Sequence, residues 1–137
     1  MKFNFISIFL CTTFSMFLNP CLSQNEICKA SYYHSKFEGR GTSNGEIFRN
    51  KKYTAAHKTL AFGTWVKLTN LKNDSVCFVR INDRLPQSSK RCIDLSQAAA
   101  GQLNMLKAGV IQVKFEIVEA TLVPEKFNSS IELKKKK

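Results

Sequence analysis

The feature that most restricts the fold is a series of short β-prone segments, separated by turn residues, between Cys28 and Val118. Apolar and polar residues alternate within them, which is typical of strands with one buried face. The second and third segments flank a polar turn and are expected to form a hairpin. The four expected strands are residues 30–33, 64–69, 75–81 and 110–118.

One helix is expected in the same region. Ser96 is a suitable N-cap, the apolar stripe that follows reaches Leu106, and Gly109 lies just past its end. Short strands with a single helix in so short a region favour a small closed or nearly closed barrel. The fold class is therefore mainly β, in one domain over residues 24–118.

Residues 1–23 have the layout of a secretory signal peptide. A basic N-terminus precedes a mostly apolar stretch from Phe5 to Leu18, and small residues precede a cleavage site ahead of Gln24. The apolar stretch is shorter than the roughly 20 residues that a membrane-spanning helix needs. A lipoprotein signal with Cys21 as the acylated residue is an alternative. The protein is thus expected to be exported and to have no stable membrane span.

The chain is strongly basic, with 21 Lys and Arg against 10 Asp and Glu and a net charge of +11. Residues 24–118 alone carry +8. This charge favours a polyanionic partner, which is nucleic acid, an anionic membrane or an acidic cell-wall glycan. Export argues against nucleic acid. Residues 119–137 contain loop formers and end in four lysines, so they are expected to be a flexible tail, with attachment to an anionic surface as the alternative.

Three cysteines lie outside the expected signal peptide: Cys28, Cys77 and Cys92. In an oxidising compartment they allow one disulfide and one free thiol, with three pairings open. No Cys or His spacing is typical of a metal site. Neither a metal nor a cofactor is expected.

Titratable residues gather in segments that also contain turn residues, where functional groups are common. A structural role competes with a functional one for each. Asp83 could cap a turn or pair with Arg84, Glu46 could be a solvated loop residue, and His57 could be a hydrogen-bonded structural residue. Asp94 fits helix capping or a hydrogen bond within the barrel. The segments are residues 37–46, 54–63, 79–86 and 91–96.

Six motifs occur in a defined order along the chain: A-S-Y-Y, F-x-G-R-x-T-x-N-G-E, T-A-A-H-K-T-L-x-F-G-T, V-x-x-T-N-L-x-N, V-R-x-N-D-R-x-P and R-x-I-D-L-S-x-A-A-A. This set resembles the rare lipoprotein A family of bacterial cell-wall lytic transglycosylases over about residues 30–118. Any one motif would be weak, but their order makes the resemblance specific. It implies a six-stranded double-psi β-barrel with one or two short helices, related in fold to expansins.

The resemblance also implies an activity and a place in the cell. The family cleaves the β-1,4 bond between N-acetylmuramic acid and N-acetylglucosamine, and the muramyl 6-hydroxyl attacks in place of water to give a 1,6-anhydro end. A monomer acting on peptidoglycan glycan strands in the periplasm or cell envelope is expected, with outer-membrane association as a further option. The alternative function is a non-catalytic, expansin-like module that binds cell-wall polysaccharide.

By resemblance, Asp83 occupies the position of the catalytic acid/base, and Glu46 and His57 lie in or beside the active site. A carboxyl that donates a proton near neutral pH needs a raised pKa, which burial or a neighbouring carboxylate such as Glu46 would supply. The residues expected to bind the glycan are Tyr32, Tyr33, Arg40, Asn44, Lys58, Asn82 and Arg84.

Two features depart from the family pattern. The family usually has Gly after the Asp-Arg pair, where this chain has Leu85. A positive φ there would strain Leu85, or else the loop takes a different path beside the presumed acid. Cys77 and Cys92 stand where aliphatic residues are more common and flank this loop, so a Cys77–Cys92 disulfide is the preferred pairing.

Overall fold

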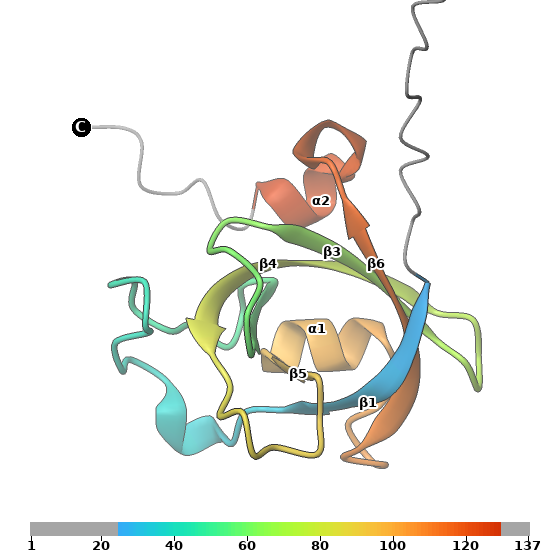
Figure 1. Cartoon of the computed structure of the whole chain (residues 1–137), viewed down its shortest axis with the longest axis horizontal. Coiled ribbons are helices and arrows are strands. Elements are labelled where there is room, and N and C mark those ends of the chain that lie inside the picture. Colours follow the sequence, from blue (N-terminus) through green and yellow to red (C-terminus); the bar gives the residue numbers. More distant parts are fainter. Residues whose placement is uncertain (1–24, 130–137) are drawn as a thin grey trace, which may run out of the picture.

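The computed structural model describes residues 25–129 as a closed six-stranded barrel with short helices (Figure 1). Around the barrel the strands follow the order β1-β5-β2-β4-β3-β6. The expected signal peptide and the terminal lysines lie outside the described residues. The strands are β1 (Glu26–Tyr32), β2 (Thr54–His57), β3 (Trp65–Asn70), β4 (Val76–Arg84), β5 (Ile93–Leu95) and β6 (Ile111–Val118).

The strand order combines one local hairpin with pairings between distant segments. β3 and β4 form the predicted antiparallel hairpin, and β6 lies antiparallel to both β3 and β1. Two pairs are parallel, β1 with β5 and β2 with β4. The parallel pairing of β2 with β4 places His57, at the end of β2, opposite Arg84, at the end of β4. The architecture confirms the prediction of a mainly β, six-stranded barrel.

The core follows from the alternation of apolar residues along the long strands. Val66 and Leu68 of β3, and Val113 of β6, are fully buried. Helix α1 (Gln97–Gln102) closes the core with Ala99 and Ala100, and Ser96 caps it by accepting a hydrogen bond from the Ala99 N–H, as predicted. In the view of Figure 1, α1 lies between β4 and β1, which it contacts.

Two strands have no counterpart among the predicted ones. β2 and β5 are 4 and 3 residues long and almost wholly buried. A strand buried on both faces shows no alternation of apolar and polar residues. This is why sequence periodicity does not find them.

The tail predicted from residue 119 is partly ordered structure. A 3-10 turn (Ala120–Leu122) and helix α2 (Glu125–Asn128) follow β6. Phe127 is 6 % exposed, and its ring centroid lies 4.8 Å from that of Tyr53 and 5.4 Å from that of Phe78. The burial of Phe127 attaches this segment to the outside of the barrel next to β4.

The predicted Cys77–Cys92 disulfide is wrong. Cys28 and Cys92 form the disulfide, with their Cα atoms 6.0 Å apart. Cys77 is a free, fully buried thiol, because it shares with Val79 and Ile81 the face of β4 that points into the barrel. The disulfide therefore joins β1 to the residue that precedes β5.

Within residues 25–129, none of the helices has the length and apolar character needed to cross a membrane.

Candidate active site

The carboxylate of Asp83 lies near the end of β4 and accepts four hydrogen bonds. The Tyr33 hydroxyl donates to Oδ2 at 2.7 Å. Oδ1 accepts from the Ser43 backbone N–H at 3.0 Å, from the Ser43 hydroxyl at 2.6 Å and from the Arg84 backbone N–H at 2.8 Å. Arg84 follows Asp83 directly, but Tyr33 and Ser43 precede it by 50 and 40 residues, so the fold assembles most of the surroundings of Asp83.

The hydrogen bonds decide the charge of Asp83. Burial of the carboxyl favours its neutral form, but the bonds donated by Ser43, Tyr33 and Arg84 outweigh that influence and hold its pKa below the usual range. The expectation that its surroundings raise this pKa is therefore wrong for the ligand-free chain. Burial, with a smaller influence from the hydrogen bond and negative charge of Asp83, raises the pKa of Tyr33. Tyr33 therefore stays protonated and donates the hydrogen bond.

A tight loop over residues 41–47 holds Ser43 against Asp83. Asn44 Oδ1 accepts hydrogen bonds from the Thr42 hydroxyl at 2.6 Å and from the Glu46 N–H at 3.1 Å. Gly45 turns the chain with φ +88°, a conformation that residues with a Cβ rarely adopt. Asn44 thus shapes the loop, and no sugar contact is needed to explain its place in the motif.

Glu46 joins the same loop to β4. Its Oε2 accepts from Arg80 Nη2 at 2.7 Å and from Asn82 Nδ2 at 3.1 Å. Partial burial would raise the pKa of Glu46, but the bonds from Arg80 and Asn82 lower it to about 2. Glu46 is therefore ionised, its charge is matched by Arg80, and it does not raise the pKa of Asp83.

His57 lies at the end of β2, beside Arg84 in the register of the sheet. Its Nδ1 accepts the backbone N–H groups of Thr59 and Leu60 at 3.1 and 3.0 Å, which leaves the ring proton on Nε2. Burial, with the charges of Arg84 and Lys58, lowers the pKa of His57. Within residues 25–129 no hydrogen bond or ion pair joins His57 to Asp83 or Glu46. Glu46 is thus linked to Asp83 only indirectly, through the loop that carries Ser43, and His57 lines a separate hollow.

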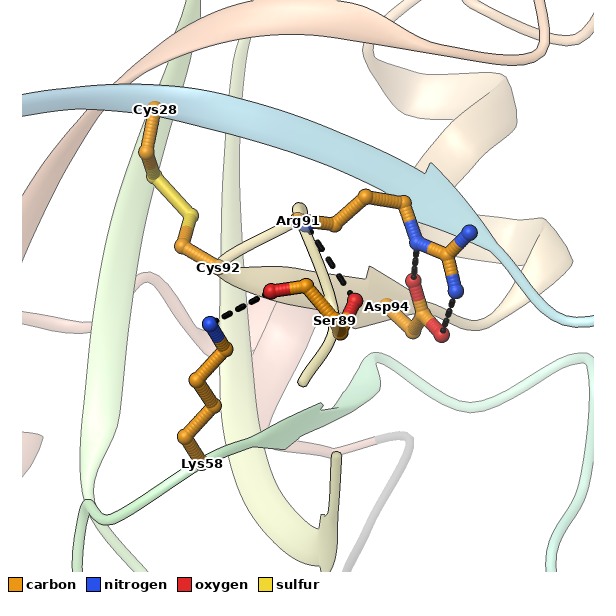
Figure 2. The surroundings of a disulfide bond; sticks show 6 residues. All are labelled: Cys28, Lys58, Ser89, Arg91, Cys92 and Asp94. Carbon is orange, nitrogen blue, oxygen red and sulfur yellow. Dashed lines mark hydrogen bonds and ion pairs between the residues drawn. A yellow bond between two sulfur atoms is a disulfide. The ribbon is translucent and has the colours of Figure 1, made fainter. Parts of the chain in front are cut away.

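That hollow has a volume of about 720 Å³. It lies beside the disulfide, between the start of β1, the end of β2 and the loop that leads to β5, as Figure 2 shows for part of its wall. Lys58, predicted to bind glycan, is fixed there by a bond from its Nζ to the Ser89 carbonyl oxygen at 2.6 Å. The lining residues are Glu26, Ile27, Cys28, Lys29, His57, Lys58, Thr59, Gln87, Lys90, Arg91, Cys92, Gln112 and Phe115.

The other predicted glycan-binding residues have structural partners. The Tyr32 hydroxyl donates to the Leu106 carbonyl oxygen at 2.9 Å, and the side chain packs against the core. Asn82 is 2 % exposed and contacts Glu46. The guanidinium of Arg84 stacks on the Phe62 ring at 4.0 Å, and that of exposed Arg40 lies 5.3 Å from the Phe37 ring. Arg40, Arg84 and Tyr33 stay predicted glycan-binding residues, and of these Tyr33 and Arg84 donate hydrogen bonds to Asp83.

Leu85 is not strained. Among residues 25–129 the only residues other than Gly with positive φ are Asp74 and Asn104. The Leu85 side chain is 6 % exposed, and its N–H donates to the His57 carbonyl oxygen at 3.3 Å. The loop after Asp83 therefore accommodates Leu85 as a buried anchor, and the departure from the family pattern has no steric cost at this backbone.

Several site residues escaped the sequence analysis. Ser43 occupies a position that its motif leaves open, so no pattern singled it out. Lys29, Lys90 and Arg91 line the hollow but lie outside the motifs or at their margins. Asp94 is part of the barrel's hydrogen bonding, since it accepts from Ser31 and, through both oxygens, from Arg91 at 2.8 and 3.1 Å. The described part of the chain holds no group of three or more His, Cys, Asp or Glu side chains arranged for a metal ion.

Comparison with known families matches residues 25–115 to the family described as lytic transglycolase. The chain belongs to the lytic transglycolase family. The match spans nearly the whole barrel, and it confirms the double-psi β-barrel fold and the resemblance drawn from the six motifs.

Curated relatives carry the same domain within longer proteins. The endolytic peptidoglycan transglycosylase RlpA of Haemophilus influenzae is 51% identical over 87 residues, which are 64% of this chain and 30% of that protein. The probable endolytic peptidoglycan transglycosylase RlpA of Treponema pallidum is 58% identical over 84 residues, 61% of this chain and 26% of that one. The chain thus matches about a third or less of the length of these relatives.

Solved structures of other proteins share the fold. The Streptomyces papain inhibitor superposes with a TM-score of 0.57 at 23% identity, covering 70% of this chain and 96% of the inhibitor. The apo expansin of Clavibacter michiganensis gives 0.56 at 19% identity, over 73% of this chain and 53% of the expansin. At these identities the likeness concerns the barrel alone.

Proposed function

We propose that the chain is an exported endolytic peptidoglycan lytic transglycosylase. It cleaves the β-1,4 bond between N-acetylmuramic acid and N-acetylglucosamine in glycan strands and leaves 1,6-anhydromuramyl ends. The observation that carries this proposal is the Asp83 carboxylate, fixed by four hydrogen bonds in a member of the lytic transglycolase family. The names of the curated relatives support the same reaction.

The reaction needs one group that first gives and then takes a proton. Protonated Asp83 donates to the glycosidic oxygen as the bond from that oxygen to the muramyl anomeric carbon breaks. The muramyl 6-hydroxyl then bonds to the same carbon and returns its proton to Asp83. Water does not react, so a second catalytic carboxyl is not required, in contrast to ordinary glycoside hydrolysis. Glu46, paired with Arg80, serves to hold the loop that carries Ser43.

Glycan binding prepares Asp83 for the first step. In the ligand-free chain its hydrogen bonds keep the carboxyl ionised, although burial already opposes them. A sugar lying over Asp83 excludes water and strengthens that opposing influence, which raises the pKa. In the proposed reaction Asp83 is an acid when the substrate covers it and a base once it has given up its proton.

The expected surroundings are the periplasm or the cell envelope, where the glycan strands lie. The positive charge of the chain suits a polymer that carries carboxylates. We propose that the chain acts there as a monomer.

The test is product analysis on purified glycan strands. The exported protein is incubated with stem-free strands, and anhydromuramyl ends are counted by mass spectrometry. We expect product from the wild type and a loss of about a hundredfold or more in Asp83→Asn. Asp74→Asn is the matched control, because Asp74 lies in the β3–β4 turn at φ 58°, which Asn also tolerates. Absence of product from the wild type refutes the enzyme, and full activity of Asp83→Asn refutes the acid/base assignment.

The non-catalytic, expansin-like alternative loses its main support. The feature that favours it is the departure from the family pattern at Leu85, two residues after the presumed acid, and Leu85 has an unstrained backbone. The same assay separates the two functions, because a binding module would retain glycan without producing anhydro ends.

A further inference from the structure

The hollow beside the disulfide carries a charge that the protein does not balance. Its lining includes the cations of Lys29, Lys58, Lys90 and Arg91 and a single acid, Glu26. Arg91 is matched by Asp94, which it binds through two nitrogens. The three lysines and Glu26 together give the lining a net charge of two positive units.

Lys29 and Lys90 are the two exposed lysines of the hollow. Neither side chain has an ion pair or hydrogen bond within the described residues. Lys58, in contrast, is anchored on the Ser89 carbonyl oxygen (Figure 2). The hollow thus has one ammonium group held by the protein and two exposed ones, an arrangement suited to an anion that arrives from outside.

Neutral donors line the same space. His57 holds its ring proton on Nε2 because two backbone N–H groups occupy Nδ1, and Nε2 has no partner in the described part of the chain. Gln87 and Gln112 add side-chain amides. At about 720 Å³ the hollow is within the range of pockets that hold small organic ligands, so it can take a sugar with its substituent.

The segment that follows Asp83 leads to the hollow. Leu85, two residues after Asp83, donates its N–H to the His57 carbonyl oxygen, and Gln87 Nε2 donates to the Lys58 carbonyl oxygen at 3.3 Å. Gln87, Lys90 and Arg91 of this segment line the hollow, as do His57 and Lys58. This segment is the physical link between the Asp83 site and the hollow.

We propose that this hollow is a subsite for a carboxylate carried on the muramic acid residues of the glycan, held by Lys29, Lys90 and Lys58 with the Nε2–H of His57. The inference rests on the proposed function, because it assumes that the bound polymer is peptidoglycan. Two sources offer this chemistry, namely the lactyl carboxylate of a bare muramic acid and the carboxylates of an attached peptide stem.

The test measures binding without cleavage. Asp83→Asn serves as the background, so that the oligosaccharide stays intact, and Lys29→Gln/Lys90→Gln is added to it. Titration calorimetry is carried out with stem-free glycan oligomers, with the same oligomers after their carboxyls are converted to amides, and with stem-bearing oligomers. The control pair is Lys72→Gln/Lys107→Gln, two exposed lysines outside this hollow whose change in net charge is the same.

We expect the amidated oligomers to bind about fivefold more weakly than the acids, and the Lys29→Gln/Lys90→Gln pair to remove that difference, as two exposed ion pairs would. The difference should shrink at high salt. If the stem-free acid shows the effect, the lactyl carboxylate is the source, and if only stem-bearing oligomers show it, the stem is. Equal binding of acid and amide, or an equal loss in the control pair, overturns the subsite.

This outcome is separable from that of the proposed function. Anhydromuramyl ends produced by the protein with wild-type Asp83 report on catalysis whether or not the two lysines matter. If the protein is catalytically active but its binding of glycan does not depend on Lys29 and Lys90, the subsite is refuted and the proposed function stands.

Discussion

The Asp83 site and the hollow beside the disulfide differ in how the protein compensates their charges. At Asp83 a single carboxylate accepts four hydrogen bonds from the protein itself. In the hollow, the side chains of Lys29 and Lys90 have no ion pair or hydrogen bond within residues 25–129. A group that transfers protons needs one fixed geometry, whereas a group that attracts a charged polymer needs charge that the fold leaves unmatched. In the function proposed above, the Asp83 site would therefore carry out the reaction and the hollow would bind the polymer.

The largest expected effect is the loss of stability when the disulfide beside the hollow is removed. Cys28 and Cys92 close a loop with a sequence separation of 64, so Cys28→Ser/Cys92→Ser should lower the free energy of unfolding by about 4 kcal/mol. Urea unfolding with and without reductant measures it. Reductant should reduce wild-type stability to that of the double variant and leave the variant unchanged. An unchanged wild-type midpoint under full reduction would contradict this.

The remaining thiol supplies a control for that experiment. Burial raises the pKa of Cys77 to about 12, so it should resist thiol reagents until the barrel unfolds. Labelling of one thiol in the unfolded, unreduced wild type, and none in the folded protein, would confirm which cysteine is free.

The second effect concerns the loop that joins the two regions. Leu85 is buried at the start of this loop, so Leu85→Ala should destabilise the fold by about 3 kcal/mol. Leu85→Gly, which restores the usual family residue, should destabilise it further, because φ is not positive here and Gly adds only chain entropy. Thermal unfolding measures both. Leu122→Ala, at a side chain 67% exposed, should change little. A gain in stability with Gly would show that the backbone is strained after all.

The sequence predicts the long strands because their side chains alternate. β3, β4 and β6 each have one face in the core and one in solvent, and the Ser96 cap marks the helix. β2 and β5 are short and buried, and they pair in parallel with strands distant in sequence, so local pattern carries no sign of them. Only the ordered motifs, through resemblance, implied the complete barrel.

The resemblance names candidate site residues, but it does not give their arrangement. Glu46 is paired with Arg80 and does not act on Asp83 as the sequence analysis expected. The cysteine error has a similar cause. The alternation of Cys77 with Val79 and Ile81 already placed it in the core, whereas the approach of Cys28 to Cys92 depends on the pairing of β1 with β5. Contacts of this kind arise from topology, which local sequence does not encode.

A smaller effect is the contribution of Glu46, in the loop over residues 41–47, to the pH dependence of the free energy of unfolding. Glu46 has a pKa of about 2 in the folded chain against 4.5 as its ordinary value. Its contribution is fully present above pH 4.5 and is lost as pH falls toward 2. Because its side chain is 38% exposed, we expect about 1 kcal/mol rather than the full value of such a shift. Unfolding free energies between these pH values should change less in Glu46→Gln than in wild type or in Glu119→Gln, an exposed control. Parallel curves for all three proteins would contradict it.

The smallest effect sharpens the comparison at Asp83 itself. Tyr33→Phe and Ser43→Ala each remove one hydroxyl that lowers the pKa of Asp83, so in each variant this pKa should rise. The proton that Asp83 donates is present below its pKa. The fall in kcat/KM with rising pH should therefore begin at higher pH in both variants than in wild type, while Thr121→Ala, on the exposed 3-10 turn, should follow wild type. If the pH at which kcat/KM falls is the same in both variants as in wild type, Tyr33 and Ser43 have only a structural role. A shift of this fall in kcat/KM to higher pH would show that the hydroxyls of Tyr33 and Ser43 lower the pKa of Asp83 as well as hold its carboxylate in position. The side chains of Lys29 and Lys90 in the hollow have no such partners within residues 25–129.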